Sequence, residues 1–257
     1  MKPATQSDSP IYRDGRHYDL LNRKTDFDIP FFLERAKLAQ GPILELACGT
    51  GRVALPLARA GLDVDGLDLS PSMLKRAQEK ARSENLKIGW IQGDARNFQA
   101  GRKYGLIFIA YDSFLYLYDF ESQKSFFDSV KAHLLPGGIL ILDAFNPNPG
   151  DLSLDWTEYK VLASYVDPDG RGNVTIRHRS RYDDASQVLH AQWLYEIGAE
   201  FKKAEDIYLR IIFPKELDLI VSASGFTTIE KLGNYQSKVF ESRDPHQVVI
   251  CRPAGVR

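Results

Sequence analysis

The stretch "ILELACGTGRVALPLARAG", residues 43–61, joins an apolar run to a helical pattern through a glycine turn. Glycine residues at Gly49 and Gly51 allow a ligand to approach the backbone where a Cβ atom would collide with it. The helix that follows begins with free backbone N–H groups, which point toward such a ligand. The stretch therefore predicts a strand, turn and helix unit that binds a ligand at the carboxyl end of the strand.

Strands and helices alternate along most of the chain. Helices are expected at 28–39, about 51–60, 71–83, about 121–134 and 214–223, and strands at 42–47, 62–69, 87–92, 104–110, 138–145, 226–233 and 247–253. Alternation of this kind indicates βαβ units, a parallel sheet and helices on both of its faces. The predicted fold class is α/β, with a doubly wound, mostly parallel, seven-stranded sheet.

The alternation stops after Phe145. From Tyr159 to Phe201, β-rich runs are separated by the polar turns "DPDGRG" and "DDAS", which predicts a small antiparallel sheet. The expected organisation is an N-terminal helical lid segment at 1–40, a core at 41–150 and 202–257, and an antiparallel β insertion at 151–201 after the fifth strand that caps the substrate site.

Composition limits the classes of partner. The chain has 257 residues, 44% of them hydrophobic, and a net charge of -1, so it lacks the basic excess typical of general nucleic-acid or anionic-membrane binders. No run reaches the length of about 18 apolar residues that a membrane span needs. Cys48 and Cys251 lie far apart and lack metal-site spacing. We expect a soluble, cytoplasmic protein that acts on a small molecule, without nucleic acid, membrane or metal.

The glycine turn by itself leaves two ligand classes open. Its spacing fits both dinucleotides and adenosyl ligands, and Asp68, at the end of the next strand, suits the ribose hydroxyls of either. Glu45 separates the two classes, because a carboxylate before the turn attracts the ammonium of an amino-acid ligand and repels a pyrophosphate. The residues therefore favour an adenosyl amino acid over a nicotinamide dinucleotide.

Four motifs stand in a familiar order: "LELACGTG", "GLDLS", "QGDARNF" and "LLPGGILILDAF". Across about residues 40–145 the chain resembles class I S-adenosylmethionine-dependent methyltransferases. The resemblance implies the Rossmann-like methyltransferase fold and S-adenosylmethionine as cofactor. The cofactor-binding residues that it implies are Glu45, Ala47, Gly49 and Gly51 at the methionine part, Asp68 at ribose, Leu69 and Met73 beside adenine, Asp94 and Ala95 at the adenine amino group, and Ala110 and Tyr111 along the methyl-donor channel.

The loop after the fourth strand narrows the type of acceptor. Adenine-N6 and glutamine methyltransferases carry an Asn/Asp-Pro-Pro-aromatic loop there, whereas this chain reads "AYDSFLYLYDF". The stretch "YDSFLYL" together with a β insertion after the fifth strand resembles the arrangement in small-molecule methyltransferases that methylate the nitrogen of glycine, sarcosine and aminosugars. The expected function is methyl transfer to a nitrogen or oxygen of a small molecule. The alternatives are a non-catalytic regulatory subunit that binds an adenosyl ligand and, more weakly supported, a nicotinamide oxidoreductase.

Catalysis by such an enzyme depends mainly on holding the acceptor in line with the activated methyl group. The candidate catalytic residues, chosen for their position near the expected pocket, are Tyr111, Asp112, Tyr116 and Trp193. Further candidates from the insertion and its return are His178, His190 and Arg210. Strand alternation places Trp193 and Tyr195 on one face and His190 and Gln192 on the other, and we expect the aromatic face to look into the cavity.

Three expectations concern the outer parts of the chain. The resemblance implies that Tyr18 and Tyr12 are lid residues beside the cofactor; the alternative is a surface helix whose aromatic side chains pack on the core. The arginine residues Arg177, Arg179 and Arg181 share one strand face, which forms either an exposed charged surface or a clamp for an anionic substrate. The insertion can also act as a homodimer interface, because exposed strand edges pair readily with a second chain.

Overall fold

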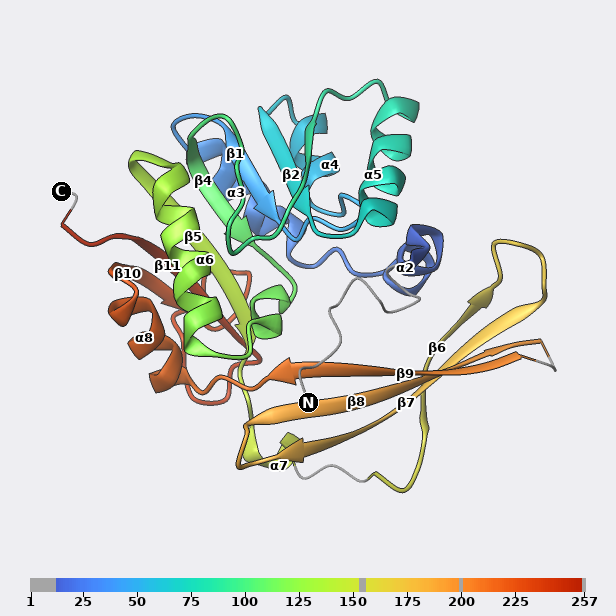
Figure 1. Ribbon diagram of the computed structural model, residues 1–257. Coiled ribbons are helices and arrows are strands. Elements are labelled where there is room, and N and C mark those ends of the chain that lie inside the picture. Colours follow the sequence, from blue (N-terminus) through green and yellow to red (C-terminus); the bar gives the residue numbers. More distant parts are fainter. Residues whose placement is uncertain (1–12, 153–155, 199–200, 256–257) are drawn as a thin grey trace.

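The computed structural model describes residues 13–152, 156–198 and 201–255 of the chain. Its centre is a seven-stranded sheet in the order β10-β11-β5-β4-β1-β2-β3 (Figure 1). The strands are β1 (Ile43–Leu46), β2 (Val64–Asp68), β3 (Gly89–Gln92), β4 (Tyr104–Ile109), β5 (Leu134–Phe145), β10 (Phe226–Leu232) and β11 (His246–Pro253). The pairs from β3 to β5 are parallel, and β11 runs antiparallel to β5 and β10. The predicted fold class is confirmed.

Helices cover both faces of this sheet. The helices are α3 (Ile29–Leu38), α4 (Ala54–Arg59), α5 (Pro71–Ser83), α6 (Phe120–His133) and α8 (Pro214–Ala223). Apolar residues of α3 and α4 pack on one face, and those of α6 and α8 pack on the other. Because both faces are covered, a central strand such as β4 is buried at every position. The carboxyl ends of β1, β2 and β4 are consequently held rigidly at one edge of the core.

The insertion is a four-stranded antiparallel sheet that contacts this edge. It consists of β6 (Lys160–Val166), β7 (Asn173–Asp183), β8 (Val188–Ile197) and β9 (Phe201–Arg210), in that order. Figure 1 shows it as a separate layer below the carboxyl ends of the parallel strands. The short helices α7 (Pro149–Leu152) and η2 (Ser113–Tyr116) complete the region.

The insertion extends further than its expected boundary at residue 201. Strand β9 pairs with β8 from Ile197↔Phe201 to Val188↔Arg210, so the antiparallel sheet ends at Arg210. The run "DIYLRIIF", residues 206–213, falls within the expected core at 202–257, because an apolar run does not reveal which strand it will pair with. The core therefore resumes near Ile211.

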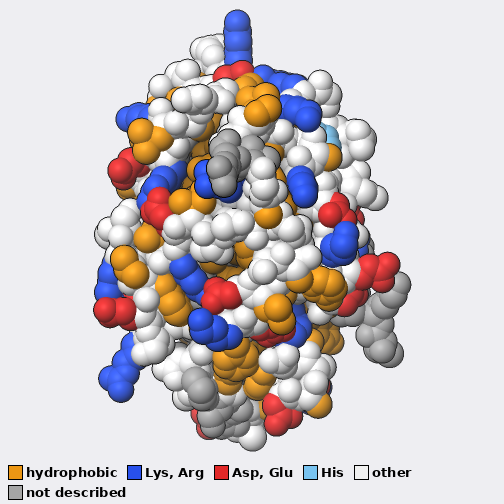
Figure 2. Space-filling model, turned by 90° about the vertical axis from the view of Figure 1, so that its left-hand side faces the viewer, with side chains coloured by type: hydrophobic (Ala, Val, Ile, Leu, Met, Phe, Trp, Pro, Cys, Tyr) orange, Lys and Arg blue, Asp and Glu red, His pale blue; other side chains and the backbone are white. Residues whose placement is uncertain are grey.

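The N-terminal segment is helical where it is described. Asp14 caps helix α2 (Gly15–Leu21), because its carboxylate accepts a hydrogen bond from the Arg16 amide. Helix α3 follows α2 along the chain. Tyr12, an expected lid residue, lies outside the described residues. Within the described ranges, no helix combines the length and apolarity required to cross a membrane. On the face shown in Figure 2, acidic and basic side chains are interspersed, in keeping with the near-zero net charge.

Candidate active site

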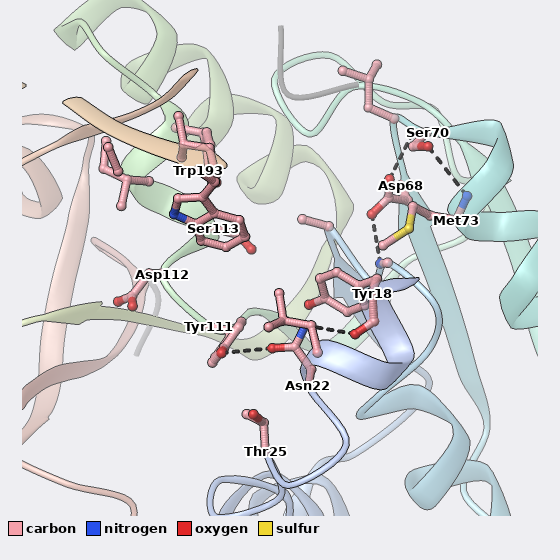
Figure 3. A pocket seen from close by; sticks show the side chains of 18 of the residues that line it. Tyr18, Asn22, Thr25, Asp68, Ser70, Met73, Tyr111, Asp112, Ser113 and Trp193 are labelled. Atoms are coloured by element: carbon pink, nitrogen blue, oxygen red, sulfur yellow. Dashed lines mark hydrogen bonds between the residues drawn. The ribbon is translucent and has the colours of Figure 1, made fainter. Parts of the chain in front are cut away.

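A cavity of about 400 Å³ lies between the carboxyl edge of the parallel sheet and the inner face of the insertion (Figure 3). This volume falls within the range of about 300–1,000 Å³ that is usual for small-molecule sites. Four parts of the chain supply its lining: Tyr18, Leu21, Asn22 and Thr25 from α2 and the loop after it; Ala47, Gly49, Asp68, Leu69, Ser70 and Met73 from the turn after β1 and from the end of β2 to the start of α5; Tyr111, Asp112, Ser113 and Tyr116 from the segment after β4 that includes η2; and Leu162, Ala163, Ala191, Trp193, Ile207 and Leu209 from the insertion.

The turn after β1 forms the backbone wall of the cavity. Ala47 and Gly49 both have left-handed backbones, with φ of 53° and 54°. A Cβ atom on Gly49 would lie 3.3 Å from Met73 Cε and would project into the lining. Glycine at 49 is therefore needed for both the conformation and the space, as the sequence predicts.

Asp68 ties this turn to the next helix. Its Oδ2 accepts a hydrogen bond from the Gly49 amide at 2.7 Å, and its Oδ1 accepts one from the Ser70 amide at 2.8 Å. Ser70 in turn caps α5 by accepting a hydrogen bond from the Met73 amide. Burial raises the pKa of Asp68. Because each carboxylate oxygen can accept more than one hydrogen bond, Asp68 keeps capacity for ribose hydroxyls, and the lining fits an adenosyl ligand.

Three of the expected cofactor residues, Glu45, Gly51 and Ala110, are not among the lining residues of the cavity. Glu45 is buried, and its Oε2 accepts a hydrogen bond from the Ala54 amide at 2.7 Å. Burial raises the pKa of Glu45 to about 8. A Cβ atom on Gly51 would lie 3.0 Å from the Trp90 ring, and Ala110 packs in the core. Contact of these three residues with a cofactor stays a prediction.

The adenine end of the cavity is only partly formed by the expected residues. Leu69, which is 42% exposed, and the buried Met73 both line the cavity. Asp94 and Ala95 lie in the loop after β3 and are not among the lining residues. Asp94 accepts hydrogen bonds from the backbone and side chain of Arg96, which lowers its pKa. Recognition of the adenine amino group by Asp94 and Ala95 stays a prediction.

Tyr111 and Asp112 occupy the loop after β4 in an unusual conformation. Both have left-handed backbones, with φ of 57° and 59°, which costs residues other than glycine about 1–2 kcal/mol each. The Tyr111 ring lies under the Arg52 guanidinium, 5.0 Å from its Cζ, and its hydroxyl donates to Asn22 Oδ1 at 3.0 Å. Burial, with a smaller effect of the nearby Asp143 charge, raises the pKa of Asp112 well above its ordinary value.

The insertion supplies an apolar wall opposite the cofactor turn. Figure 3 shows Trp193 on the side of the cavity away from Asp68 and Met73. Tyr195, on the same strand face, is buried against Tyr165 and Ile176. The aromatic face of β8 therefore faces inward, with Trp193 on the lining, and Tyr116 lines the cavity from η2.

The other polar candidates of the insertion do not line the cavity. His190 lies on the opposite face, where its Nε2 is 2.7 Å from Asp206 Oδ1. His178 pairs with Trp193 across the strands but is not a lining residue, and burial lowers its pKa. Arg210 donates a hydrogen bond to Gln187 at the end of β9.

The three arginine residues of β7 do not form a clamp inside the cavity. Arg177 pairs with Glu196, and Arg179 donates to Gln192 and lies over the Trp156 ring. Arg181 also lies over Trp156. They share the outer face of the sheet with His190, so the interpretation as a charged outer surface holds.

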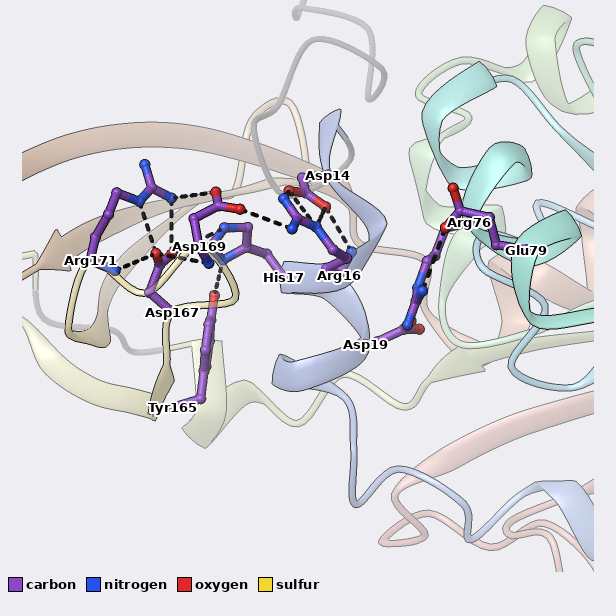
Figure 4. Close-up of polar contacts among 10 residues, drawn as sticks. All are labelled: Asp14, Arg16, His17, Asp19, Arg76, Glu79, Tyr165, Asp167, Asp169 and Arg171. Atoms are coloured by element: carbon purple, nitrogen blue, oxygen red, sulfur yellow. Dashed lines mark hydrogen bonds and ion pairs between the residues drawn. The ribbon is translucent and has the colours of Figure 1, made fainter. Parts of the chain in front are cut away.

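Helix α2 connects the insertion to the core beside the cavity (Figure 4). On one side, Arg16 forms an ion pair with Asp169 at 2.9 Å, and His17 Nδ1 lies 2.9 Å from the Tyr165 hydroxyl. On the other side, Asp19 accepts hydrogen bonds from Arg76, Lys80 and Thr50 at 2.7–2.9 Å. Tyr18, between these contacts, lines the cavity.

Several lining residues were not anticipated. Asn22 stands four residues after Tyr18, a spacing that places both on one helix face, and this signal could have identified it. Thr25 and Ser113 carry no comparable signal. Leu162, Ile207 and Leu209 belong to strands whose partners had to be known first.

The chain matches known proteins over most of its length. Residues 43–138 match the family model described as "Methyltransferase domain". The protein named "Putative methyltransferase YqeM" of Bacillus subtilis (strain 168) is 37% identical over 197 residues, which are 76% of this chain and 77% of YqeM. The dTDP-3-amino-3,4,6-trideoxy-alpha-D-glucopyranose N,N-dimethyltransferase of Streptomyces venezuelae is 27% identical over 216 residues, 81% of this chain and 87% of that protein. The structure of the CcbJ methyltransferase from Streptomyces caelestis superposes with a TM-score of 0.76 at 25% identity, over 90% of each chain.

The doubly wound sheet, the glycine turn and the cavity at its carboxyl edge define a Rossmann-like methyltransferase. The chain belongs to the class I S-adenosylmethionine-dependent methyltransferases. It is an enzyme that uses S-adenosylmethionine to methylate a nitrogen or oxygen of a small molecule. The two alternatives, a non-catalytic regulatory subunit and a nicotinamide oxidoreductase, are wrong.

Proposed function

We propose that the methyl acceptor is an amine whose body is mostly apolar and carries no phosphate. One observation carries this proposal: among the described residues that line the cavity, the charged side chains are Asp68 and Asp112, both carboxylates. A carboxylate attracts an ammonium group and repels a phosphate. The lining thus favours a cationic acceptor over an anionic one.

The part of the cavity lined by the insertion, here called the acceptor half, is apolar and supports the same class of molecule. Its insertion wall consists of Leu162, Ala163, Ala191, Trp193, Ile207 and Leu209. Such a wall stabilises an apolar body by removing it from water, at about 25 cal/mol per Å². Relatives named as amino-sugar N,N-dimethyltransferases act on dTDP-linked molecules. This chain, by contrast, offers no cation for a diphosphate among the described lining residues.

The chain's own residues would then perform three tasks. The bound cofactor supplies an activated sulfonium methyl group. Tyr111 and Trp193 hold the acceptor and exclude water, and Asp112 orients the amine and accepts the proton that it must lose to become a nucleophile. Burial raises the pKa of Asp112 above its ordinary value, which makes its carboxylate a better proton acceptor than an exposed aspartate.

Nitrogen is favoured over oxygen as the acceptor atom. A hydroxyl acceptor becomes nucleophilic only when a base removes its proton, and histidine is the residue that commonly does so. Histidine is absent from the described lining of the cavity. An amine needs less help, because its neutral form is already nucleophilic.

A panel of acceptors tests the proposal. The protein would be incubated with S-adenosylmethionine and benzylamine, cyclohexylamine, phenol and a dTDP-linked amino sugar, and formation of S-adenosylhomocysteine and of methylated product would be followed by mass spectrometry. We expect turnover of the simple amines. Preferential methylation of phenol or of the nucleotide-linked sugar would contradict the assignment.

We further propose that two copies of the chain associate through the insertion. Strand β6 is an edge strand of the antiparallel sheet, and its Val161 and Val166 are 58% and 67% exposed. Exposed apolar edge strands pair readily with a second chain. Val161→Lys combined with Val166→Lys should shift the mass measured by light scattering from dimer to monomer; a wild-type monomer would exclude the interface.

A further inference from the structure

Asp143 and Tyr235 lie outside the cavity lining. Asp143 contacts the loop after β4, which lines the cavity, and Tyr235 contacts Asp143. Asp143 is 1% exposed and Tyr235 is 7% exposed. Asp143 stands near the end of β5, and Tyr235 follows β10. The motifs recognised in the sequence assign neither residue a role, and a buried carboxylate requires partners that stabilise its charge or its proton.

The partners of Asp143 are the backbone amides of two successive cavity residues. Its Oδ2 accepts a hydrogen bond from the Tyr111 amide at 3.0 Å, and its Oδ1 accepts one from the Asp112 amide at 3.1 Å. The Tyr235 hydroxyl donates to the same Oδ2. One carboxylate therefore fixes the direction of two consecutive peptide units.

The connection is reciprocal. While the Asp112 amide donates to Asp143, the Asp112 carboxylate accepts a hydrogen bond from the Phe145 amide at 2.6 Å. The loop after β4 and the end of β5 are thus joined by hydrogen bonds in both directions. This arrangement supports the left-handed backbone of Tyr111 and Asp112, a conformation that residues other than glycine rarely adopt without such support.

The Tyr235 ring is fixed from the other side. It lies in a cluster of aromatic rings, 5.8 Å from Phe31 and 4.9 Å from His246 between ring centroids. Tyr235 therefore has little freedom to move, and its hydroxyl holds the Asp143 carboxylate in one orientation. The chain of contacts leads from the hydrophobic core, through Tyr235 and Asp143, to the Tyr111 and Asp112 backbones.

We propose that Asp143 and Tyr235 are positioning residues for methyl transfer. They hold Tyr111 and Asp112 in the strained conformation that directs the Tyr111 ring toward Asn22 and keeps Asp112 on the cavity lining. The methyl-transfer geometry depends on this support, because displacements of about 1 Å at a reacting centre can cost on the order of a hundredfold in rate.

The same sheet contains a matched pair that serves as a control. The Tyr104 hydroxyl donates to Asp65 Oδ2 at 2.7 Å, and both residues are buried. Tyr104 begins β4 and Asp65 lies near the start of β2, at the ends of these strands opposite the cavity. Asp65 Oδ2 also accepts a hydrogen bond from Arg102 at 2.7 Å. Removing either tyrosine hydroxyl should disturb packing comparably, but only one pair supports the cavity loop.

The experiment compares Asp143→Asn and Tyr235→Phe with Asp65→Asn and Tyr104→Phe. The first readout is the ratio of calorimetric Kd values for S-adenosylhomocysteine and for sinefungin, a cofactor analogue with an ammonium group in place of the methylated sulfonium. This ratio reports on the groups at the point of methyl transfer and needs no acceptor. The second readout is kcat and KM with whichever acceptor the panel identifies.

We expect Tyr235→Phe to reduce the preference for sinefungin about threefold and kcat about tenfold, because the Asp143 carboxylate loses the hydrogen bond that orients it toward the loop. The effects of Asp143→Asn should be larger, because its own contacts with the Tyr111 and Asp112 amides weaken. Tyr104→Phe should lower Tm by a similar amount and leave both readouts within about twofold. Equal effects of Tyr235→Phe and Tyr104→Phe, or an unchanged sinefungin ratio in Tyr235→Phe, would overturn the proposal. If Asp143→Asn fails to fold, the comparison of Tyr235→Phe with Tyr104→Phe decides. If no molecule of the acceptor panel is methylated, the ratio of the Kd values for S-adenosylhomocysteine and sinefungin still tests the proposal.

Discussion

The two halves of the cavity are built in different ways. The cofactor half consists of backbone turns at strand ends, where Gly49, Asp68 and Ser70 are joined by short hydrogen bonds. The acceptor half consists of side chains on an added sheet, chiefly Trp193 and Ile207. Backbone geometry is suited to a constant ligand, while side chains on a separate sheet can change without disturbing the core. The comparison predicts that substitutions in one half leave the other half functional.

The largest expected effect is on the cofactor half. Asp68→Ala should weaken S-adenosylmethionine binding by about 1.5 to 3 kcal/mol, because charged hydrogen bonds to ribose are lost and the Gly49 turn loses its anchor. Gly49→Val should be at least as damaging, since its side chain would enter the lining. Calorimetry measures both. Asp63→Ala, an exposed carboxylate before β2, is the control, and an Asp68→Ala variant with unchanged affinity would refute the assignment.

The next effect concerns the acceptor half. Trp193→Ala should lower kcat/KM for the acceptor about tenfold to a hundredfold, because the enclosing wall is lost, while cofactor affinity stays within about twofold. Steady-state kinetics and calorimetry on one preparation measure the two quantities. Trp156, on the outer face of the same insertion, provides the matched control. If Trp156→Ala reduces turnover as much as Trp193→Ala does, the effect belongs to folding of the sheet and not to the cavity.

A smaller effect is expected where the halves meet. Asp19→Ala removes the contacts of α2 with Arg76, Lys80 and Thr50. The dissociation rate of S-adenosylmethionine should rise about threefold, as expected for loss of a partly exposed ionic network, and deletion of residues 1–20 should raise it further. Stopped-flow fluorescence measures the rate. A truncated protein that retains the cofactor as long as the full chain does would show that this segment is no lid.

A separate effect, on the stability of the fold and not on ligand binding, is a pH dependence that arises in the cofactor half. The pKa of Glu45 is about 8 in the folded protein, above its ordinary value of 4.5, so between these values the folded state binds a proton that the unfolded state does not. The free energy of unfolding should therefore fall as pH rises through this window. Burial also raises the pKa values of the neighbouring carboxyl groups of Asp112 and Asp143, which act in the same direction.

The measurement is Tm of the cofactor-free protein at about pH 5 and at about pH 8.5, on either side of most of this window. Glu45→Gln should reduce the difference between the two Tm values. If the bound cofactor places its ammonium near Glu45, binding will also release a proton, detected by calorimetry in buffers of different ionisation enthalpy. If Glu45→Gln keeps the pH dependence of the wild-type protein, Glu45 does not titrate within this pH window.

Sequence reasoning succeeded where chemistry is local. Gly49 and Asp68, which both line the cavity, lie within short stretches whose residue types dictate the backbone. Asp143 could not be found this way, because it is 32 residues from Tyr111 in sequence. The two become neighbours only through the β4–β5 register, in which Ile109 pairs with Leu142. The same limit explains the misplaced boundary near residue 201, since pairing partners are a property of the assembled sheet.

Helix α2 forms a wall that the cofactor half and the acceptor half of the cavity share. This shared wall affects the order in which the two ligands leave. Arg16 and His17 attach it to the insertion, Asp19 attaches it to α5 and the glycine turn, and Tyr18 faces the cavity between them. A movement that lifts the insertion to admit an acceptor must therefore pull on the wall of the cofactor site. Acceptor release and cofactor release are expected to share one opening event, so that a molecule requiring two methyl groups would leave and rebind between transfers.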